Sequence, residues 1–152
     1  MELRPLHIGI SVTDMDQAIA WYGKHLGFQL VKDDGFLPPL GARVCFLQQG
    51  DFQVELFQYQ DPKPLPPGRR HPNTDLQTVG TKHIAFGVSD LDAVKARFTA
   101  NGVEIAHELA MNGDHVLFIR DCCGTLIGKK GTVSGKKHKA YYQCCDCKYK
   151  AE

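Results

Sequence analysis

Two histidines and one glutamate are the residues of this 152-residue chain whose types and placement suit metal chemistry. His7 and His83 each begin a short run of alternating apolar residues, and Glu55 interrupts the apolar run Phe52–Tyr59. Imidazole nitrogens and carboxylate oxygens are common ligands of divalent ions such as Zn, Ni, Fe and Mn. An unpaired carboxylate in an apolar strand is costly, so Glu55 requires a cationic partner. These residues fit a divalent metal site about as well as they fit two hydrogen-bonded core histidines and a Glu55–Arg43 ion pair.

Both histidines stand at the start of an internal repeat. Residues 7–27 read HIGISVTDMDQAIAWYGKHLG, and residues 83–102 read HIAFGVSDLDAVKARFTANG. Each copy combines an alternating strand, a polar helix start, an amphipathic helix and a glycine stop. The repeat strengthens the metal hypothesis, because both histidines occupy equivalent positions.

The strand that follows each histidine carries small residues on the histidine's own face. Side chains alternate between strand faces, so His7 shares its face with Gly9 and Ser11. The corresponding neighbours of His83 are Ala85 and Gly87. The apolar residues in between point toward the helix of each copy. Small residues leave room for a ligand, so we expect a cavity on the face away from the helices, with Ser11 contacting the substrate.

Further strand-like runs follow each helix, which predicts two βαβββ modules. These runs cover residues 28–32, 42–48 and 52–59 in the first copy and 103–107, 116–120 and 125–128 in the second. The pattern predicts an α+β fold with two tandem modules, residues 1–60 and 81–128. One such module has too little core to stand alone, so the two copies should pack on each other.

A proline-rich segment, residues 61–80, joins the modules and is too long for a hairpin, so it is expected to be a linker or a lid. Arg69, Arg70 and His71 in this segment are candidates for holding an acidic group of a substrate. The competing interpretation is that these residues simply face solvent.

Residues 129–152 form a basic, cysteine-rich tail that we expect to be flexible. A zinc clip is the weaker hypothesis, because zinc knuckles usually pair two cysteines as C-x2-C. The tail does not show that spacing at its potential ligands, His138, Cys144, Cys145 and Cys147.

The overall composition excludes several classes of function. Eighteen basic and seventeen acidic residues leave a net charge of +1, which argues against a nucleic-acid partner. No apolar run approaches the roughly 18 residues that span a bilayer. The first residues, MELRPLHIGI, do not resemble a secretory signal. We therefore expect a cytoplasmic protein that binds a small molecule, with no membrane partner.

Three segments of the chain resemble the vicinal oxygen chelate superfamily: HIGISVTDMDQAIAWYGKHLGF, TKHIAFGVSDLDAV and HVLFIRDCCGTLI. This superfamily includes glyoxalase I, methylmalonyl-CoA epimerase, extradiol dioxygenases, and fosfomycin and bleomycin resistance proteins. The resemblance covers about residues 5–128. It implies that the two modules form a curved mixed sheet around a central cavity that holds one divalent metal ion.

The resemblance also implies a ligand set drawn from the first and last strands of each module. Carried onto this chain, those positions are His7, Glu55, His83 and Gly128. Family members commonly read Pro-Asp-Gly-Asn-Leu-Ile-Glu at the last position, so the fourth ligand is absent here. Water, Cys122 or Cys123 is a possible replacement.

The resemblance leaves three hypotheses for function. The first is a metal-dependent lyase or isomerase of the glyoxalase type, acting on a small substrate with vicinal oxygens. Glu55 would serve as ligand and proton-transfer base, and His115 as a second acid or base unless it is a surface residue at a strand start. The second is a metal-free, ligand-sequestering protein of the bleomycin-resistance type, which the loss at Gly128 favours. The third, an extradiol dioxygenase, ranks last because Gly128 removes its carboxylate ligand. We expect a homodimer.

Overall fold

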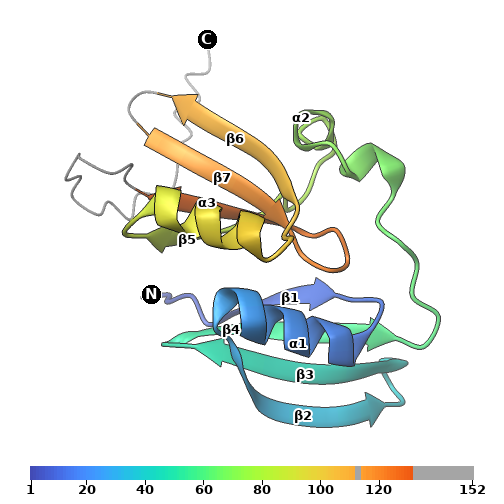
Figure 1. Cartoon of the computed structure of the whole chain (residues 1–152). Helices are drawn as coiled ribbons and strands as arrows, with labels where there is room; N and C mark the ends of the chain where they lie inside the picture. Colours follow the sequence, from blue (N-terminus) through green and yellow to red (C-terminus); the bar gives the residue numbers. More distant parts are fainter. Residues whose placement is uncertain (112–113, 132–152) are drawn as a thin grey trace.

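The computed structural model describes residues 1–111 and 114–131 and contains two βαβββ modules, as predicted. The first module runs in the order β1 (His7–Ser11), α1 (Met15–Leu26), β2 (Gln29–Leu37), β3 (Ala42–Gln49) and β4 (Phe52–Tyr59). The second runs in the order β5 (Ile84–Val88), α3 (Leu91–Ala100), β6 (Ile105–Met111), β7 (Asp114–Arg120) and β8 (Leu126–Gly131). The α+β fold class is therefore confirmed (Figure 1).

Each module builds one four-stranded mixed sheet, with strand order β1-β4-β3-β2 in the first and β5-β8-β7-β6 in the second. The first and last strands of a module are parallel neighbours, and the remaining pairs are antiparallel. In this register Gly9 lies opposite Glu55, and Ala85 lies opposite Gly128. The topology thus brings together strands that are far apart in the sequence.

The two main helices begin and bury their apolar faces as the repeat predicts. Asp14 caps α1 by accepting a hydrogen bond from the Gln17 amide, and Asp90 caps α3 through the Ala93 amide, both at 2.9 Å. Gly27 ends α1 in the left-handed conformation. The buried apolar residues of the helices are Met15, Ala18, Tyr22 and Leu26 of α1 and Leu91 and Phe98 of α3.

Strand β2 differs from the sequence prediction, which placed a break at Asp33-Asp34-Gly35. The strand continues through these residues with two register shifts against β3. Gly35 has a positive φ of 65°, and its amide donates to the Asp33 carboxylate at 2.9 Å. The turn-like residues therefore form β-bulges inside a longer strand.

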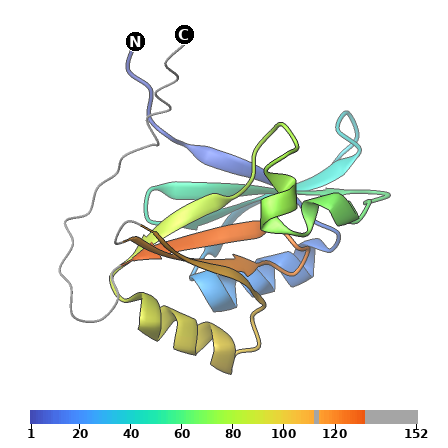
Figure 2. The same cartoon turned by 90° about the horizontal axis from the view of Figure 1, so that it is seen from above.

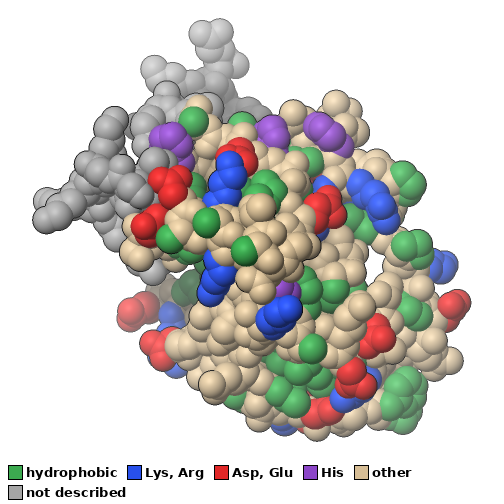
Figure 3. All heavy atoms as spheres, in the orientation of Figure 1, with side chains coloured by type: hydrophobic (Ala, Val, Ile, Leu, Met, Phe, Trp, Pro, Cys, Tyr) green, Lys and Arg blue, Asp and Glu red, His purple; other side chains and the backbone are tan. Residues whose placement is uncertain are grey.

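Both helices lie on the same side of the two sheets, and the modules pack against each other on that side (Figures 1 and 2). The Phe86 ring of β5 contacts the Phe28 and Phe52 rings of the first module, with centroids 5.9 and 6.0 Å apart. The Tyr22 hydroxyl of α1 donates to the Asp121 carboxylate at 2.9 Å. Basic and acidic side chains are interspersed on the helix-bearing face (Figure 3).

The segment 61–80 contains two short helices, η1 (Pro67–Arg69) and α2 (Pro72–Asp75). It lies outside the layer formed by α1 and α3 (Figure 2). The buried Asp75 carboxylate anchors it by binding Arg69 and Lys82.

Strand β8 continues to Gly131, and residues 132–152 lie outside the described residues. The zinc clip considered for His138, Cys144, Cys145 and Cys147 falls in that part of the chain. No helix in the described ranges is long and apolar enough to cross a membrane.

The Tyr22–Asp121 hydrogen bond predicts a measurable contribution to stability. Tyr22→Phe leaves a buried Asp121 oxygen without its donor and is expected to lower the free energy of unfolding by about 1–3 kcal/mol. Urea denaturation measures this change. Tyr59→Phe, at a hydroxyl-bearing ring that is 53% exposed, is the matched control and should have little effect. Equal effects of the two substitutions would contradict the prediction.

Candidate metal site

The His7 and Glu55 side chains meet on the sheet face away from the helices. Strands β1 and β4 are parallel neighbours, and His7 Nε2 lies 3.3 Å from Glu55 Oε2. The imidazole is 38% exposed and the carboxylate 19% exposed, so a solvent-borne ligand can reach both. The partner of the Glu55 carboxylate is therefore a histidine.

The predicted alternative partner, Arg43, lies elsewhere. Its guanidinium contacts Asp16 at 2.9 Å and Asp33 at 2.7 Å. Arg43 pairs in register with Gln58, whereas Phe46 pairs with Glu55. The Glu55–Arg43 ion pair is thus wrong, because Arg43 points to the helix side of the sheet.

The separation of the His7 and Glu55 donor atoms suits a shared metal ion. Two ligand atoms bound at about 2.1 Å, at angles between octahedral and tetrahedral, lie about 3.0–3.4 Å apart. The observed 3.3 Å falls in this range. The His7 and Glu55 donor atoms are therefore spaced as two ligands of one ion would be. Among residues 1–111 and 114–131, no group of three or more His, Cys, Asp or Glu side chains is close enough to hold a metal ion.

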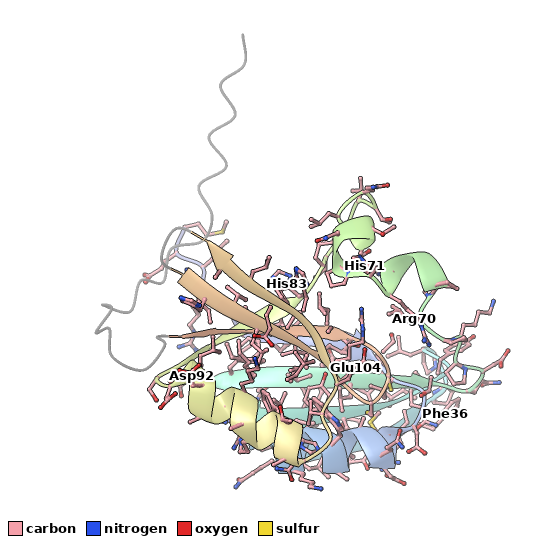
Figure 4. All side chains as sticks on the ribbon, turned by 45° about the horizontal axis from the view of Figure 1, so that its top comes forward. Phe36, Arg70, His71, His83, Asp92 and Glu104 are labelled. Atoms are coloured by element: carbon pink, nitrogen blue, oxygen red, sulfur yellow. The ribbon has the colours of Figure 1, made fainter. Side chains whose placement is uncertain are left out.

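His83, the third predicted ligand, precedes β5 and lies beside the Phe118 ring (Figure 4). The two rings meet edge to face with centroids 5.0 Å apart. Partial desolvation lowers the pKa of His83. This shift favours the neutral imidazole, which is the form that binds metal ions. The structure does not bring His83 into contact with the His7–Glu55 pair.

The two modules nevertheless present matching rows of side chains on this face. In the first module the His7 ring lies 6.0 Å from the Phe46 ring, and Phe46 pairs with Glu55. In the second module His83 contacts Phe118, which pairs with Gly128. Sequence analysis missed both phenylalanines, although their alternation with buried core residues on β3 and β7 marks them as lying on the histidine face.

The position of the absent fourth ligand is closed rather than open. A Cβ atom at Gly128 would lie 3.3 Å from Ala85 Cβ and 3.4 Å from both His83 Cδ2 and Phe118 Cε1. Neither predicted cysteine replaces the missing carboxylate. Cys123 instead contacts Thr13, at the start of α1.

Comparisons with known proteins agree with this architecture. The model of the Glyoxalase/Bleomycin resistance protein/Dioxygenase superfamily matches residues 4–128. The chain belongs to this superfamily. It is 28% identical to human mitochondrial methylmalonyl-CoA epimerase over 130 residues, which cover 80% of this chain and 69% of the epimerase. It is 29% identical to YwkD of Bacillus subtilis over 98 residues, which cover 64% of this chain and 71% of YwkD.

Solved structures of the superfamily show the same fold. A glyoxalase/bleomycin resistance protein/dioxygenase domain from Frankia superposes with a TM-score of 0.69 at 16% identity, covering 90% of this chain and 96% of that domain. The glyoxalase I of Leishmania major superposes with a TM-score of 0.67 at 24% identity, covering 86% and 87%.

The residues predicted to contact the substrate, Ser11, Arg69 and Arg70, differ in their exposure and in their partners. Ser11 is exposed at the end of β1, on the His7 face. The Arg69 guanidinium is occupied by Asp75 at 2.9 Å and by the Thr81 carbonyl at 2.7 Å. Arg70 is exposed and has no side-chain partner among the described residues (Figure 4). Of the two arginines, only Arg70 has a guanidinium free for a ligand.

His115 lies on the helix-bearing face of the second sheet, whereas Glu55 lies on the first sheet, on the face away from the helices. It shares a face with Leu117 and Ile119, and that face packs under α3. His115 lines a groove of about 210 Å³ together with Leu91, Asp92, Lys95, Glu108, Leu109, Ala110, Val116 and Leu117. The structure therefore does not bring His115 to the His7–Glu55 pair.

The space expected beside Gly9 is also occupied. A Cβ atom at Gly9 would lie 3.1 Å from the Phe57 ring. The small residue on β1 thus accommodates an aromatic side chain of β4. Phe57 shares the face of Glu55 and forms an apolar wall next to it.

The contacts of Arg69 predict that it is a structural residue. Arg69→Ala removes the partner of a buried carboxylate and is expected to lower the urea midpoint of unfolding. The hydrogen bond from Arg69, together with that from Lys82, outweighs the effect of burial and keeps the pKa of Asp75 below its usual range. The stabilisation is therefore present at neutral pH and lost as the pH falls through the folded-state pKa. Arg70→Ala is the matched control. A midpoint unchanged by Arg69→Ala would contradict the prediction.

Proposed function

We propose that this superfamily member is a divalent-metal-dependent lyase or isomerase that acts on a small substrate with vicinal oxygens. The observation that carries the proposal is the 3.3 Å contact between His7 Nε2 and Glu55 Oε2 on an exposed sheet face. The relation to methylmalonyl-CoA epimerase supports chemistry at a carbon next to a carbonyl. The similarity to glyoxalase structures supports the fold that such a site needs.

His7 and Glu55 would hold the ion, and His83 would complete the set only by moving toward this pair, which it does not contact in the structure. Their two imidazoles and one carboxylate suit Zn, Ni, Fe or Mn. When bound, such an ion polarises the substrate oxygens as a Lewis acid. Gly128 supplies no donor, so these three protein ligands would leave the ion open to coordination by substrate oxygen.

Glu55 is the residue that would move the proton. Its carboxylate is mostly covered by neighbouring strands and keeps one exposed edge, 19% of the side chain. A carboxylate in this position can accept a proton from a carbon next to a carbonyl and return it to the adjacent atom. The Phe46 and Phe57 rings flank it and limit the access of water.

Two further residues would orient the substrate. The Ser11 hydroxyl faces the same side as His7 and offers a hydrogen bond. Arg70 offers a guanidinium to a carboxylate or phosphate group of the substrate.

A second candidate function is metal-free ligand sequestration of the bleomycin-resistance type. The observation that favours it is Gly128, where the neighbouring His83, Ala85 and Phe118 leave no place for a fourth donor without movement. This function requires tight ligand binding by the protein after its metal has been removed.

The ligand assignment predicts the metal content of variants. Glu55→Gln and His83→Ala should each weaken Zn or Ni binding by at least about tenfold, because each removes one of three ligands. His115→Ala, on the helix-bearing face of the second sheet, should bind like the wild type. Competition titration with a chromogenic chelator, on protein without a histidine tag, measures these affinities. Less than about 0.1 metal per wild-type chain after reloading would contradict the enzyme proposal and leave ligand sequestration.

Metal binding and catalysis can be separated by a proton-exchange assay. Incorporation of solvent deuterium into dihydroxyacetone, a small compound with vicinal oxygens, reports proton abstraction. Glu55→Gln is expected to reduce the rate by at least about a hundredfold even at saturating metal. If the metal-loaded wild-type protein did not incorporate deuterium into dihydroxyacetone, the result would argue for a binding role.

The missing carboxylate at Gly128 predicts a gain in metal affinity when a carboxylate is introduced there. Gly128→Glu should raise the affinity for a divalent ion by about tenfold or more, provided that His83 and Phe118 shift by a few tenths of an ångström. Gly128→Gln has the same size without the charge and is the control. If both variants had native circular dichroism spectra and equal metal affinities, the result would contradict a metal site beside Gly128.

A further inference from the structure

The turn between β7 and β8 carries two adjacent cysteines whose sulfur atoms lie in different surroundings. Cys123 Sγ accepts a hydrogen bond from the Thr13 amide at 3.3 Å and lies 3.4 Å from Thr13 Oγ1. Cys122 Sγ lies 3.9 Å from Cys123 Sγ. Thr13 belongs to the first module, so this sulfur contacts a donor from the other half of the molecule.

These three contacts favour a negative charge on Cys123 Sγ. The Thr13 amide can only donate, and the hydroxyl and the neighbouring thiol can both turn their hydrogens toward a thiolate. A thiol is a weak acceptor, whereas a thiolate accepts hydrogen bonds strongly and is the nucleophilic form of cysteine. Cys123 is only partly buried, so a small reagent can reach it.

The acidic neighbours of Cys123 are engaged by other donors. Asp121 Oδ1 accepts from the Cys123 and Thr125 amides at 2.9 and 2.8 Å, and its Oδ2 accepts from the Tyr22 hydroxyl. The Asp14 carboxylate caps α1 through the Gln17 amide.

The balance of these effects differs between the two thiols. The Cys122 and Thr13 hydrogen bonds outweigh burial and lower the pKa of Cys123 to about 6. The hydrogen bond to Cys123, together with burial, raises the pKa of Cys122. Either sulfur can donate across their 3.9 Å contact, and the opposite directions of the two pKa shifts favour Cys122 as the donor.

We propose that Cys123 is a reactive thiolate, separate from the His7–Glu55 site, that forms covalent adducts with small carbon electrophiles. With an α-halo carbonyl compound, the Sγ–carbon bond forms, the carbon–halogen bond breaks, and halide leaves with the electron pair. No oxidant is required. Cys122 remains a thiol and keeps its hydrogen bond to the reacting sulfur until the adduct forms.

Alkylation of the whole chain by iodoacetamide between pH 5 and 9 tests the proposal. The tryptic peptide DCCGTLIGK, residues 121–129, contains Cys122 and Cys123 and no other cysteine, and fragmentation in the mass spectrometer assigns the adduct. The Cys123 rate should be half-maximal near pH 6, whereas an ordinary thiol titrates near pH 8.5. Cys45 is buried in β3, and burial raises its pKa to about 11, so it is an internal control.

Lower pKa also lowers intrinsic nucleophilicity, so the shape of the pH profile is a sharper readout than the rate at one pH. At pH 6 about half of Cys123 is thiolate, against less than about 1% of an ordinary thiol. After the loss of nucleophilicity, the expected advantage is about tenfold at pH 6 and only about twofold to threefold at pH 7.

Variants of the donors make the test specific. Thr13→Ala removes the hydroxyl and keeps the amide, so the half-maximal pH should rise by about half a unit or more, and Thr13→Ser should restore it. Cys123→Ser should abolish the fast adduct and leave metal affinity unchanged. A half-maximal pH of 8 or higher in the wild type would overturn the proposal, as would a Thr13→Ala profile identical to that of the wild type.

Discussion

The parallel pairing of the first and last strands within each module is the constraint on which the candidate site depends. Strand β1 contributes His7 and strand β4 contributes Glu55, and their register places Gly9 opposite Glu55. The three antiparallel strands alone would leave the histidine without its partner. The connection from β1 to β4 runs through α1, β2 and β3, because parallel neighbours cannot be joined by a hairpin. The helix therefore stabilises the site without contributing a side chain to it.

The features that the sequence predicts well follow from the alternation of side chains along a strand, which repeats every two residues. Alternation of side chains assigns Ile8, Ile10 and Val12 to the core and His7 to the opposite face, as the structure shows. The repeat transfers the same assignment to the second module. Period alone does not specify which strands are neighbours, and so it could not decide between His7 and Arg43 as the partner of Glu55. Arg43 lies on an adjacent strand but opposite Gln58, one residue out of phase with the Glu55 face.

Other differences arise where two local rules compete. Asp33-Asp34-Gly35 is typical of a turn, yet the ladder between β2 and β3 absorbs it as bulges. Gly9 is small enough to leave a cavity, yet the Phe57 ring fills the space. His115 is a candidate acid or base by residue type, yet the structure places it beside α3, on the helix-bearing face of the second sheet. In each case the outcome depends on side chains that are distant in the sequence.

Gly128 occupies the position in the second module that Glu55 occupies in the first. The absence of a carboxylate there has a chemical consequence for the proposed metal site. A ligand set of two histidines and two carboxylates neutralises a divalent ion, whereas His7, Glu55 and His83 carry only one negative charge. An ion held by the proposed set would keep one net positive charge in a partly covered site, where electrostatic interactions are stronger than in water. That charge favours a substrate that binds through an anionic oxygen, such as an enediolate or a carboxylate. The crowding of His83, Ala85 and Phe118 around Gly128 would keep a protein group from neutralising that charge. In the proposed metal site, glycine at position 128 would therefore change the electrostatic preference for substrate while leaving the fold intact.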